Sequence, residues 1–477
     1  MRKLALLLAV LLVFYLPGCS APAETAPEGE TAGGTTVRAE GQIGLAFERE
    51  AGLEPFACMS SVNRLILSLL YDPLFRVSAE FAAEPMLAES WSVSEDGKTT
   101  TVLLCEGETF SDGSPVTAED AVTSLRLAKQ SEVYGSRLRH VTDLRASDER
   151  TLVLTTDEPY ECLPLLLDIP ILRETGDGRQ PLGSGAYVPE GSASLRRRED
   201  KRCPLTAKSI LLIPVETGDG LHSGFRAGGI SLTVSDLNDV SPLLLQESPN
   251  IWSVPTTEFL YLGFHLSSTV FSSGSIRSAV SYALDREKIV AEDLSGFAVA
   301  TPLTAPPGSP WYVQEAAESV TYDPDRLREA VTRGLTVSLL YNADNPRHQT
   351  VAHRVSDALT ECGLAVTLNA LPSEAYAAAL KAGSFDLYLG QIRLAPDLDT
   401  EPLFRAGSGA CFGGLDSLPQ LRQACDLTRA NHGNSAALQN SILLDGVLCP
   451  IAFLEDALCV RSEAKSDYKP CIDRPIA

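Results

Sequence analysis

The sequence predicts a mixed α/β protein built from more than one packed unit, and three observations carry this prediction. The chain has 477 residues, 44% of them hydrophobic, whereas a single core rarely serves more than about 250 residues. A strand, a helix and a second strand are predicted in succession within residues 335–368. A pair of strands followed by a capped helix is predicted within residues 91–122. Strands and helices therefore alternate along a chain long enough to bury a large core.

The first 18 residues are predicted to be a secretion signal. Arg2 and Lys3 precede an unbroken apolar run over residues 4–16, which as a helix of about 20 Å is too short to cross a hydrocarbon layer of about 30 Å. The run ends in Leu16-Pro17-Gly18-Cys19, which resembles the lipobox of bacterial lipoproteins and implies acylation at Cys19. Residues 19–40 are then a lipidated cysteine and a flexible linker, because this stretch has too few apolar side chains to fold.

The next clear elements form a hairpin and a helix. Residues 91–93 and 99–104 are strand-like and flank the turn residues 94–97, where Gly97 suits a positive φ angle. Thr117 is the predicted N-cap of a helix whose first turn carries Glu119 and Asp120. This region is therefore predicted to be α+β.

A longer alternation of strands and helices lies in residues 335–389. The predicted order is strand, helix, strand, helix, strand, over residues 335–341, 347–362, 365–368, 373–381 and 385–389. Gly363 and Gly383 are placed to end the two helices. The first three elements form a βαβ unit. The third strand is apolar on both faces, so parallel, buried strands are predicted.

Composition and motifs exclude several classes of function. The formal net charge of −23 argues against binding of nucleic acid or anionic lipid surfaces, which requires clustered Lys and Arg. The chain lacks a Gly-x-Ser-x-Gly elbow, and Gly97-Lys98-Thr99 lacks the first glycine of a P-loop. The six histidines are dispersed. We therefore predict no catalysis, no metal and no cofactor, with an exported hydrolase as the rival class. The ten cysteines after Cys19 are either disulfide-bonded or free buried thiols.

Eight runs, taken in their order along the chain, resemble one family. They are Leu70–Phe75, Met86–Trp91, Asp96–Thr99, Phe110–Asp120, Pro181–Tyr187, Tyr261–Phe264, Arg277–Arg286 and Pro306–Tyr312. In this order they are similar to family 5 extracellular solute-binding proteins, the oligopeptide, dipeptide and nickel receptors of ABC transporters. The resemblance implies a two-lobed, periplasmic-binding-protein-like clamshell with an extra inserted domain.

The resemblance also implies a division of the chain. A discontinuous domain I would comprise residues 41–63, 178–255 and 455–477, with residues 64–177 inserted as domain II. Residues 256–454 would form domain III, the opposing lobe.

The function implied is capture of a peptide or peptide-like small solute between the lobes, followed by delivery to a permease. The implied partners are the solute, two membrane subunits and two cytoplasmic ATPases, and the receptor is expected to be a monomer. It would be exported and held by its lipids at the outer face of the bacterial cytoplasmic membrane. The alternatives are a receptor for a metal chelate or other anionic small molecule, a secreted hydrolase, and a surface adhesin or chaperone.

Candidate binding residues lie where apolar strands end in polar residues, since ligands of open α/β sheets bind beyond the carboxyl ends of strands. One strand-like run, residues 43–47, ends in Phe47 and Glu48 and is followed by Phe56; a solvated turn is the alternative. A second run, residues 387–390, leads into Gln391 and Arg393, which point to one side of a strand.

The second run departs from the family pattern. In peptide-binding relatives this strand commonly leads into a Trp and then an Asp that meets the α-amino group of the peptide. Alignment on Gly390 and Asp397 places Gln391 and Leu394 at those positions, so the amine clamp is absent. Arg393 is then the predicted partner of an anionic group on the ligand.

Three acidic residues offer Arg393 another role, because it could pair instead with Asp397, Asp399 or Glu401. Asp397 is itself a candidate ligand contact. Tyr261 and Phe264 could line the site, although aromatic residues at such strand positions more often belong to the core.

Overall fold

The computed structural model describes residues 41–175, 180–216, 218–237 and 250–476. The predicted signal segment, Cys19 and the linker lie outside the described residues. The described residues form a mixed α/β fold, as predicted from the sequence. None of their helices combines the length and the hydropathy that a bilayer span requires.

One large sheet organises the structure and counts 11 strands among the described residues. In spatial order its main path is β10 (Tyr187–Pro189), β11 (Ser194–Arg197), β12 (Ser209–Val215), β1 (Gln42–Glu48), β13 (Leu232–Ser235), β19 (Leu448–Val460), β14 (Asn250–Phe264), β18 (Leu387–Arg393), β16 (Thr336–Asn342) and β17 (Ala365–Leu371), and β15 (Ala298–Ala300) pairs with β19. We call residues 41–255 and 455–476 the outer part of the chain, and residues 256–454 the central part.

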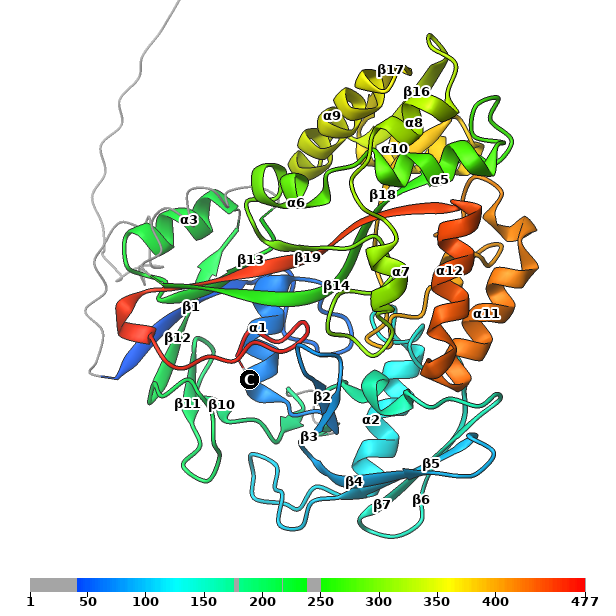
Figure 1. The fold of residues 1–477 in the computed structure, drawn as a ribbon. Coiled ribbons are helices and arrows are strands. Elements are labelled where there is room, and N and C mark those ends of the chain that lie inside the picture. The colour runs from blue at the N-terminus through cyan, green and yellow to red at the C-terminus, as the bar shows by residue number, and fades with distance from the viewer. Residues whose placement is uncertain (1–40, 176–179, 217, 238–249, 477) are drawn as a thin grey trace, which may run out of the picture. The chain divides into compact units, whose positions relative to one another are not determined.

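Two long antiparallel strands, β14 and β19, connect these parts (Figure 1). The first half of β14 pairs with the last half of β19 beside β13, and its second half pairs with β18. The ladder between β14 and β19 shifts register between Pro255 and Phe259. Proline cannot donate a ladder hydrogen bond, so a break is expected there.

The hydroxyls of Thr256 and Thr257 satisfy backbone carbonyls at this break. Thr256 Oγ1 donates to Leu454 O at 2.7 Å, and Thr257 Oγ1 donates to Leu394 O at 2.7 Å. Both threonines are buried. The chain therefore changes register without leaving these carbonyls unsatisfied.

The smaller sheets lie in the outer part. A four-stranded antiparallel sheet has the order β4 (Ala88–Val93), β5 (Thr99–Leu104), β7 (Thr151–Thr156) and β6 (Val141–Ala146), and two-stranded sheets join β2 (Phe75–Val77) with β3 (Ala83–Pro85) and β8 (Leu172–Arg173) with β9 (Leu182–Gly183). The predicted hairpin is confirmed as β4 and β5, with Gly97 at φ 71°.

The α-helices of four or more residues in the described ranges follow in chain order. They are α1 (Ser61–Leu70), α2 (Ala118–Gln130), α3 (Gly218–Arg226), α5 (Gly274–Tyr282), α7 (Gln314–Glu318), α8 (Asp325–Ala330), α9 (Pro346–Glu361), α10 (Ser373–Ala382), α11 (Pro419–Ala430) and α12 (Ser435–Asp445); α6 (Arg286–Lys288) is a single short turn. The predicted cap of α2 is confirmed, because Thr117 and Asp120 form a reciprocal capping box.

The predicted βαβ unit is confirmed by β16, α9 and β17, whose two strands pair in parallel. β18 also pairs in parallel with β16, but its other neighbour, β14, is antiparallel. The prediction of buried parallel strands fits β16 and the first half of β18 and is wrong for β17. β17 is the edge strand, so one side of its ladder and much of its surface face solvent.

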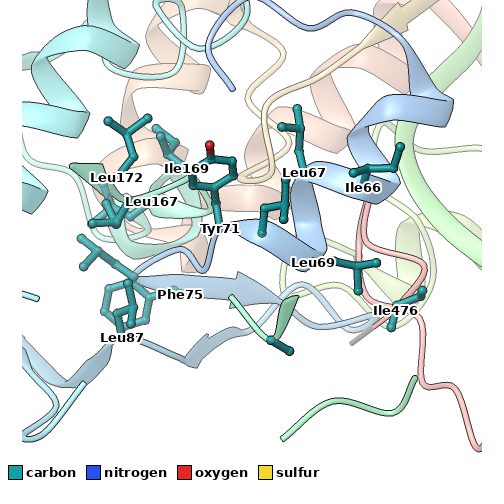
Figure 2. Close-up of a cluster of buried hydrophobic side chains, with 14 of the residues drawn as sticks. Ile66, Leu67, Leu69, Tyr71, Phe75, Leu87, Leu167, Ile169, Leu172 and Ile476 are labelled. Carbon is teal, nitrogen blue, oxygen red and sulfur yellow. The ribbon is translucent and has the colours of Figure 1, made fainter. Parts of the chain in front are cut away.

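The hydrophobic cores follow the outer and central parts. One cluster contains only outer-part residues, among them Tyr71, Phe75 and Ile476, which Figure 2 shows with their neighbours. Another contains only residues from Leu260 to Leu454. A third draws mostly on the central part but includes Val77, Phe81, Leu165 and Ile472 of the outer part. The two parts thus have separate cores and meet across the third cluster.

The ten cysteines from Cys58 to Cys471 are all free. Six of them are buried, namely Cys58, Cys362, Cys425, Cys449, Cys459 and Cys471. Of the two alternatives left by the sequence, the structure therefore has free thiols.

Candidate functional site

Strands from both parts of the chain end at the register shift of β14 and β19. β13 of the outer part ends at Ser235, opposite Ala457. β18 of the central part approaches from the other direction and ends at Arg393, opposite Glu258. The carboxyl ends of strands from two separate cores therefore face one short stretch of crossing backbone, which is where ligand sites form in α/β proteins.

Gln391 and Arg393 lie on one face of β18, as their alternate spacing predicts, and both contact Glu258. Gln391 Nε2 donates to Glu258 Oε2 at 2.5 Å, and Arg393 Nη2 donates to Glu258 Oε1 at 2.7 Å. Arg393 also forms an ion pair with Asp473. Burial by itself lowers the pKa of Arg393, but Asp473 and Glu258 outweigh it and raise that pKa.

The ion-pair partners of Arg393 differ from the sequence-based alternatives Asp397, Asp399 and Glu401. Asp473 comes from the C-terminal segment, where its backbone N–H donates to Pro255 O at 3.0 Å and its φ angle is 56°. A non-glycine residue at positive φ is uncommon and is retained only where its surroundings hold it. Because Arg393 already has two carboxylates, its charge is matched within the protein.

Arg347, in the first turn of α9, is a buried cation with few partners. Asn345 caps this helix and accepts hydrogen bonds from the backbone N–H groups of Arg347 and His348. The Arg347 residue is 6% exposed, and among the described residues its guanidinium makes one hydrogen bond, of 3.4 Å, to Glu455 O. Burial lowers the pKa of Arg347, opposed by Asp456 and other nearby acids. Its remaining N–H donors are free to bind an acceptor.

Asp456 is an acidic residue that, like Arg347, has few partners. It lies on β19, and no described residue forms a hydrogen bond or ion pair with its carboxylate. Burial raises the pKa of Asp456 to about 7; Arg393 opposes this shift, and Glu258 and Asp473 add to it. A cation placed beside Asp456 would restore its ionised form.

His348 adds a neutral acceptor to this group. Its Nε2 lies 3.0 Å from Gln391 Oε1, and burial lowers its pKa to about 4. The Gln391 amide donates to Glu258, so its oxygen accepts from His348 Nε2–H. The Nδ1 lone pair of His348 is then a buried acceptor with no partner in the described part of the chain. We call Arg347, His348 and Asp456 the open polar cluster.

The sequence analysis named neighbours of this cluster but missed its three members. Glu455 and Asp456 interrupt an otherwise apolar strand, β19. Charged residues inside such a run are a usable signal of a functional position. Arg347 and His348 lie in an ordinary amphipathic helix pattern, and no sequence signal singled them out.

The residues predicted near β1 take mainly structural places. Phe47 is partly buried and packs against the outer core. At Glu48, the buried Asn63 side chain binds both backbone groups, accepting from the N–H at 2.9 Å and donating to the carbonyl at 2.8 Å. Phe56 contacts Tyr134 edge to face, with ring centroids 6.2 Å apart. The structure does not bring these side chains into contact with Gln391 or Arg393, and their role in binding stays a prediction.

Tyr261 lies in the third cluster, stacked on Phe259 and hydrogen-bonded to Tyr388 across 3.4 Å. Its ring covers Gly390, where an added Cβ would lie 2.6 Å from Tyr261 Cζ. The glycine in the run 387–390 is therefore required by close packing. A role of Tyr261 in binding is untested, and its contacts are those of a core residue.

Asp397 belongs to a second place where the outer and central parts meet. There the Tyr160 hydroxyl donates to Asp397, Arg429 pairs with Asp399 and Glu158, and Arg139 pairs with Asp399. We call these six residues the paired seam. A cavity of about 20 Å³ beside Asp397 and Arg429 has room for one water molecule.

Opposite charges at the paired seam balance one another. Burial alone would raise the pKa of Asp399, but Arg429 and Arg139 hold it below its usual value. Asp397, which has no arginine of its own, has a raised pKa because of burial and the neighbouring Asp399 charge. Asp397 accepts hydrogen bonds from the Tyr160 hydroxyl and from the Asp399 backbone N–H, both within the seam, so we assign the seam a structural role.

Comparison with known proteins places the chain among solute-binding proteins. Residues 82–410 match the profile of the bacterial extracellular solute-binding proteins, family 5. A probable peptide ABC transporter periplasmic-binding protein, y4tO of Sinorhizobium fredii, is 32% identical over 164 residues, which cover 32% of this chain and 31% of that protein. The glutathione-binding protein GsiB of Shigella flexneri is 22% identical over 356 residues, 69% of each chain.

Solved structures of solute-binding proteins share the fold of this chain. The ABC transporter substrate-binding protein CtaP of Listeria monocytogenes superposes with a TM-score of 0.73 at 20% identity, covering 88% of this chain and 94% of that one. The fold is thus the two-lobed type of periplasmic binding proteins, as predicted. With the family profile matching well over half of its length, the chain belongs to the bacterial extracellular solute-binding proteins of family 5.

Proposed function

We propose that this protein is the substrate-binding lipoprotein of an ABC importer and that it captures a peptide or peptide-like solute between its outer and central parts. Such a receptor makes and breaks no covalent bonds. It binds the solute, closes because the closed arrangement binds more tightly, and delivers the solute to a permease.

The observation that carries the substrate class is the open polar cluster. Within the part of the chain that the structure describes, Arg347 is a buried cation with donors to spare, and Asp456 is an acid without a bonded partner. One group suits a carboxylate and the other suits an amine, and a peptide carries both. His348 Nδ1 can accept a hydrogen bond from a peptide N–H. The names of the relatives y4tO and GsiB, which refer to a peptide and to glutathione, support the same class.

In this proposal Arg393 supports the site from within. Its two carboxylate partners leave Arg347 as the better candidate for the anionic end of the ligand. Gln391 holds His348 and Glu258 in place, and Phe47, Glu48, Phe56, Tyr261 and Asp397 remain proposed contacts. The domain limits at residues 63, 177, 255 and 454 also remain proposals. The separate cores support those at 255 and 454, whereas one core spans the limits at 63 and 177.

The experiment that tests the function is analysis of the solute carried by the purified protein. The protein is denatured, the released small molecules are identified by mass spectrometry, and each is titrated back by calorimetry. Short peptides bound with 1:1 stoichiometry support the proposal. Release of a single non-peptide compound would contradict the proposed substrate class. Chemical conversion of the bound compound by the protein would contradict the proposed receptor function.

We also propose that Cys19 is acylated and anchors the protein at the outer face of the cytoplasmic membrane. The support is the sequence Leu16-Pro17-Gly18-Cys19 after an apolar run. Membrane fractionation of cells that express the wild type and Cys19→Ser tests the anchor. The substituted protein should leave the membrane fraction, and its retention there would contradict the proposal. We expect a monomer that contacts two permease subunits, which two cytoplasmic ATPases would drive.

A further inference from the structure

Three side chains from the two parts of the chain come together beside the paired seam. Glu161 and Cys162 follow β7 in the outer part, and His432 follows α11 in the central part. His432 Nδ1 lies 2.8 Å from Glu161 Oε2, and the His432 backbone N–H donates to the same oxygen at 2.9 Å. One carboxylate oxygen of Glu161, the Cys162 thiol sulfur and one ring nitrogen of His432 all lie within 4.8 Å of one another.

Backbone hydrogen bonds hold these side chains at their places. The N–H of Glu161 donates to Arg429 O at 3.2 Å, which ties the outer segment to the end of α11. Asn431 Oδ1 accepts from Gly433 N–H at 2.8 Å and fixes the turn that carries His432. The Cys162 carbonyl accepts from Leu165 N–H at 3.0 Å at the start of a short helical turn. The three ligand atoms are therefore brought together by the fold.

Carboxylate, thiolate and imidazole together are a ligand set for zinc. Zinc bonds of about 2.0–2.3 Å in tetrahedral geometry hold ligand atoms roughly 3.3–3.8 Å apart. The three ligand atoms lie within 4.8 Å of one another, and His432 Nδ1 and Glu161 Oε2, now 2.8 Å apart in a hydrogen bond, would move slightly apart to admit the ion. We propose that Glu161, Cys162 and His432 bind a borderline divalent cation, with Zn²⁺ as the type case and water as a fourth ligand. Zinc binds cysteine as the thiolate, so the Cys162 thiol proton leaves to solvent as the metal–sulfur bond forms.

A neighbouring group shows why this set is preferred. His140, Asp157 and Glu158 also place three ligand atoms within 4.8 Å. Glu158, however, is already paired with the Arg429 guanidinium, which would repel a cation. This second group also lacks a sulfur ligand. Zn²⁺ should therefore choose the group that contains Cys162 and His432.

The bound cation would join the outer and central parts, because its ligands come from both. This consequence is separate from the proposed peptide binding, which involves the open polar cluster. Metal binding is therefore measured on the full chain without any peptide, so that failure of either proposal leaves the other intact.

Cobalt titration of the reduced full-length protein tests the site. Wild type should bind one equivalent of Co²⁺ with a sulfur-to-cobalt charge-transfer absorption, and Zn²⁺ should displace it. Cys162→Ser should abolish the charge-transfer band. His432→Ala and Glu161→Gln should keep the band and raise the Kd for Co²⁺ at least about 10-fold, the lower end of the loss seen when even an outer partner is removed.

Cys105→Ser is the matched control, since Cys105 is another half-buried free thiol of the outer part. It should bind Co²⁺ as wild type does. If Cys162→Ser is unstable, the Kd of the Glu161→Gln variant for Co²⁺ still tests the proposal, because Glu161 is exposed and its substitution should not affect folding. Absence of a one-equivalent band in wild type, an unchanged Kd in both Glu161→Gln and His432→Ala, or loss of the band in Cys105→Ser would overturn the proposal.

Discussion

The outer and central parts of the chain meet through two charged groups that differ in how completely they are paired. At the paired seam, Arg429 is 6% exposed and contacts the carboxylates of Asp399 and Glu158. In the open polar cluster, Arg347 is equally buried, but its guanidinium makes one long hydrogen bond within the described residues. Both guanidinium groups lose contact with water on folding. Within the described residues, only that of Arg429 gains carboxylate partners that compensate for the loss.

This difference separates structural from functional charge. A buried ion pair contributes little net stability, but breaking one partner leaves an uncompensated charge and is costly. A buried charge without a partner already destabilises the folded protein before any ligand binds. Such a group is best explained by a ligand that completes it, which is why we assign the open polar cluster to binding.

The largest effect is expected at the paired seam. Arg429→Met should lower the free energy of unfolding by about 3–5 kcal/mol, because Asp399 and Glu158 lose their main counter-charge. Urea denaturation measures the change. Arg145→Met is the control, because Arg145 pairs with Asp143 at an exposed position and should change the value by less than about 0.5 kcal/mol. Equal effects of the two substitutions would remove the distinction between paired and open charges.

The second substitution should weaken solute binding without lowering the stability of the protein. Arg347→Gln should weaken affinity for the solute recovered from the protein by roughly 10- to 100-fold, the value of hydrogen bonds to a charged group. Its free energy of unfolding should stay constant or rise, since a poorly solvated charge is removed. Calorimetry and denaturation measure the two quantities. Arg354→Gln, on the same helix but paired at the surface with Asp293, should leave affinity unchanged.

The third effect concerns pH and Asp456. Its pKa is raised to about 7 in the folded protein, against about 3.9 in an unfolded chain. Between these values the folded protein keeps a proton that the unfolded chain has lost, so this contribution to stability falls as pH rises from 4 to 7. Asp456→Asn should therefore be more stable than wild type at pH 8, by about 1–2 kcal/mol after solvent screening. The two proteins should match near pH 4.

Denaturation curves at the two pH values test this prediction. A constant difference between wild type and Asp456→Asn across the pH range would show that the aspartate is ionised throughout and is not an open acid.

The smallest effect is expected at Tyr261. Tyr261→Phe removes a 3.4 Å contact with the Tyr388 hydroxyl and should lower the free energy of unfolding by at most about 1 kcal/mol. Solute affinity should change less than twofold, because the substitution keeps the ring that packs over Gly390 and removes only the hydroxyl. A larger loss of affinity would show that the Tyr261 hydroxyl itself contacts the solute.

Local chemistry explains which parts of the fold could be predicted from the sequence. The capping box at Thr117 and the turn at Gly97 are decided by neighbours within a few residues. The unit β16–α9–β17 follows from hydrophobic periodicity and from Gly363 at the end of its helix. The exposure of β17 could not be predicted in this way, because it depends on which strand ends the sheet.

The candidate site was predicted only in part, because its charges meet over long sequence distances. Gln391 and Arg393 were found from the end of an apolar strand. The Arg393 partner Asp473 lies 80 residues away along the chain, and Arg347 meets Glu455 across 108 residues. Sequence spacing carries no information about such pairs. The open polar cluster became visible only once the partners of each charge could be counted in the described structure.

The pairing of Pro255 with Glu455 across β14 and β19 has a consequence for protein engineering. Directly paired residues of an antiparallel ladder lie about 5 Å apart, so the chain departs into its central part and comes back at neighbouring points. A two-residue turn could link these points, and the segment between them, which has a core of its own, could be produced as a free-standing module. Exchange of that module between related receptors would then require only two splice points.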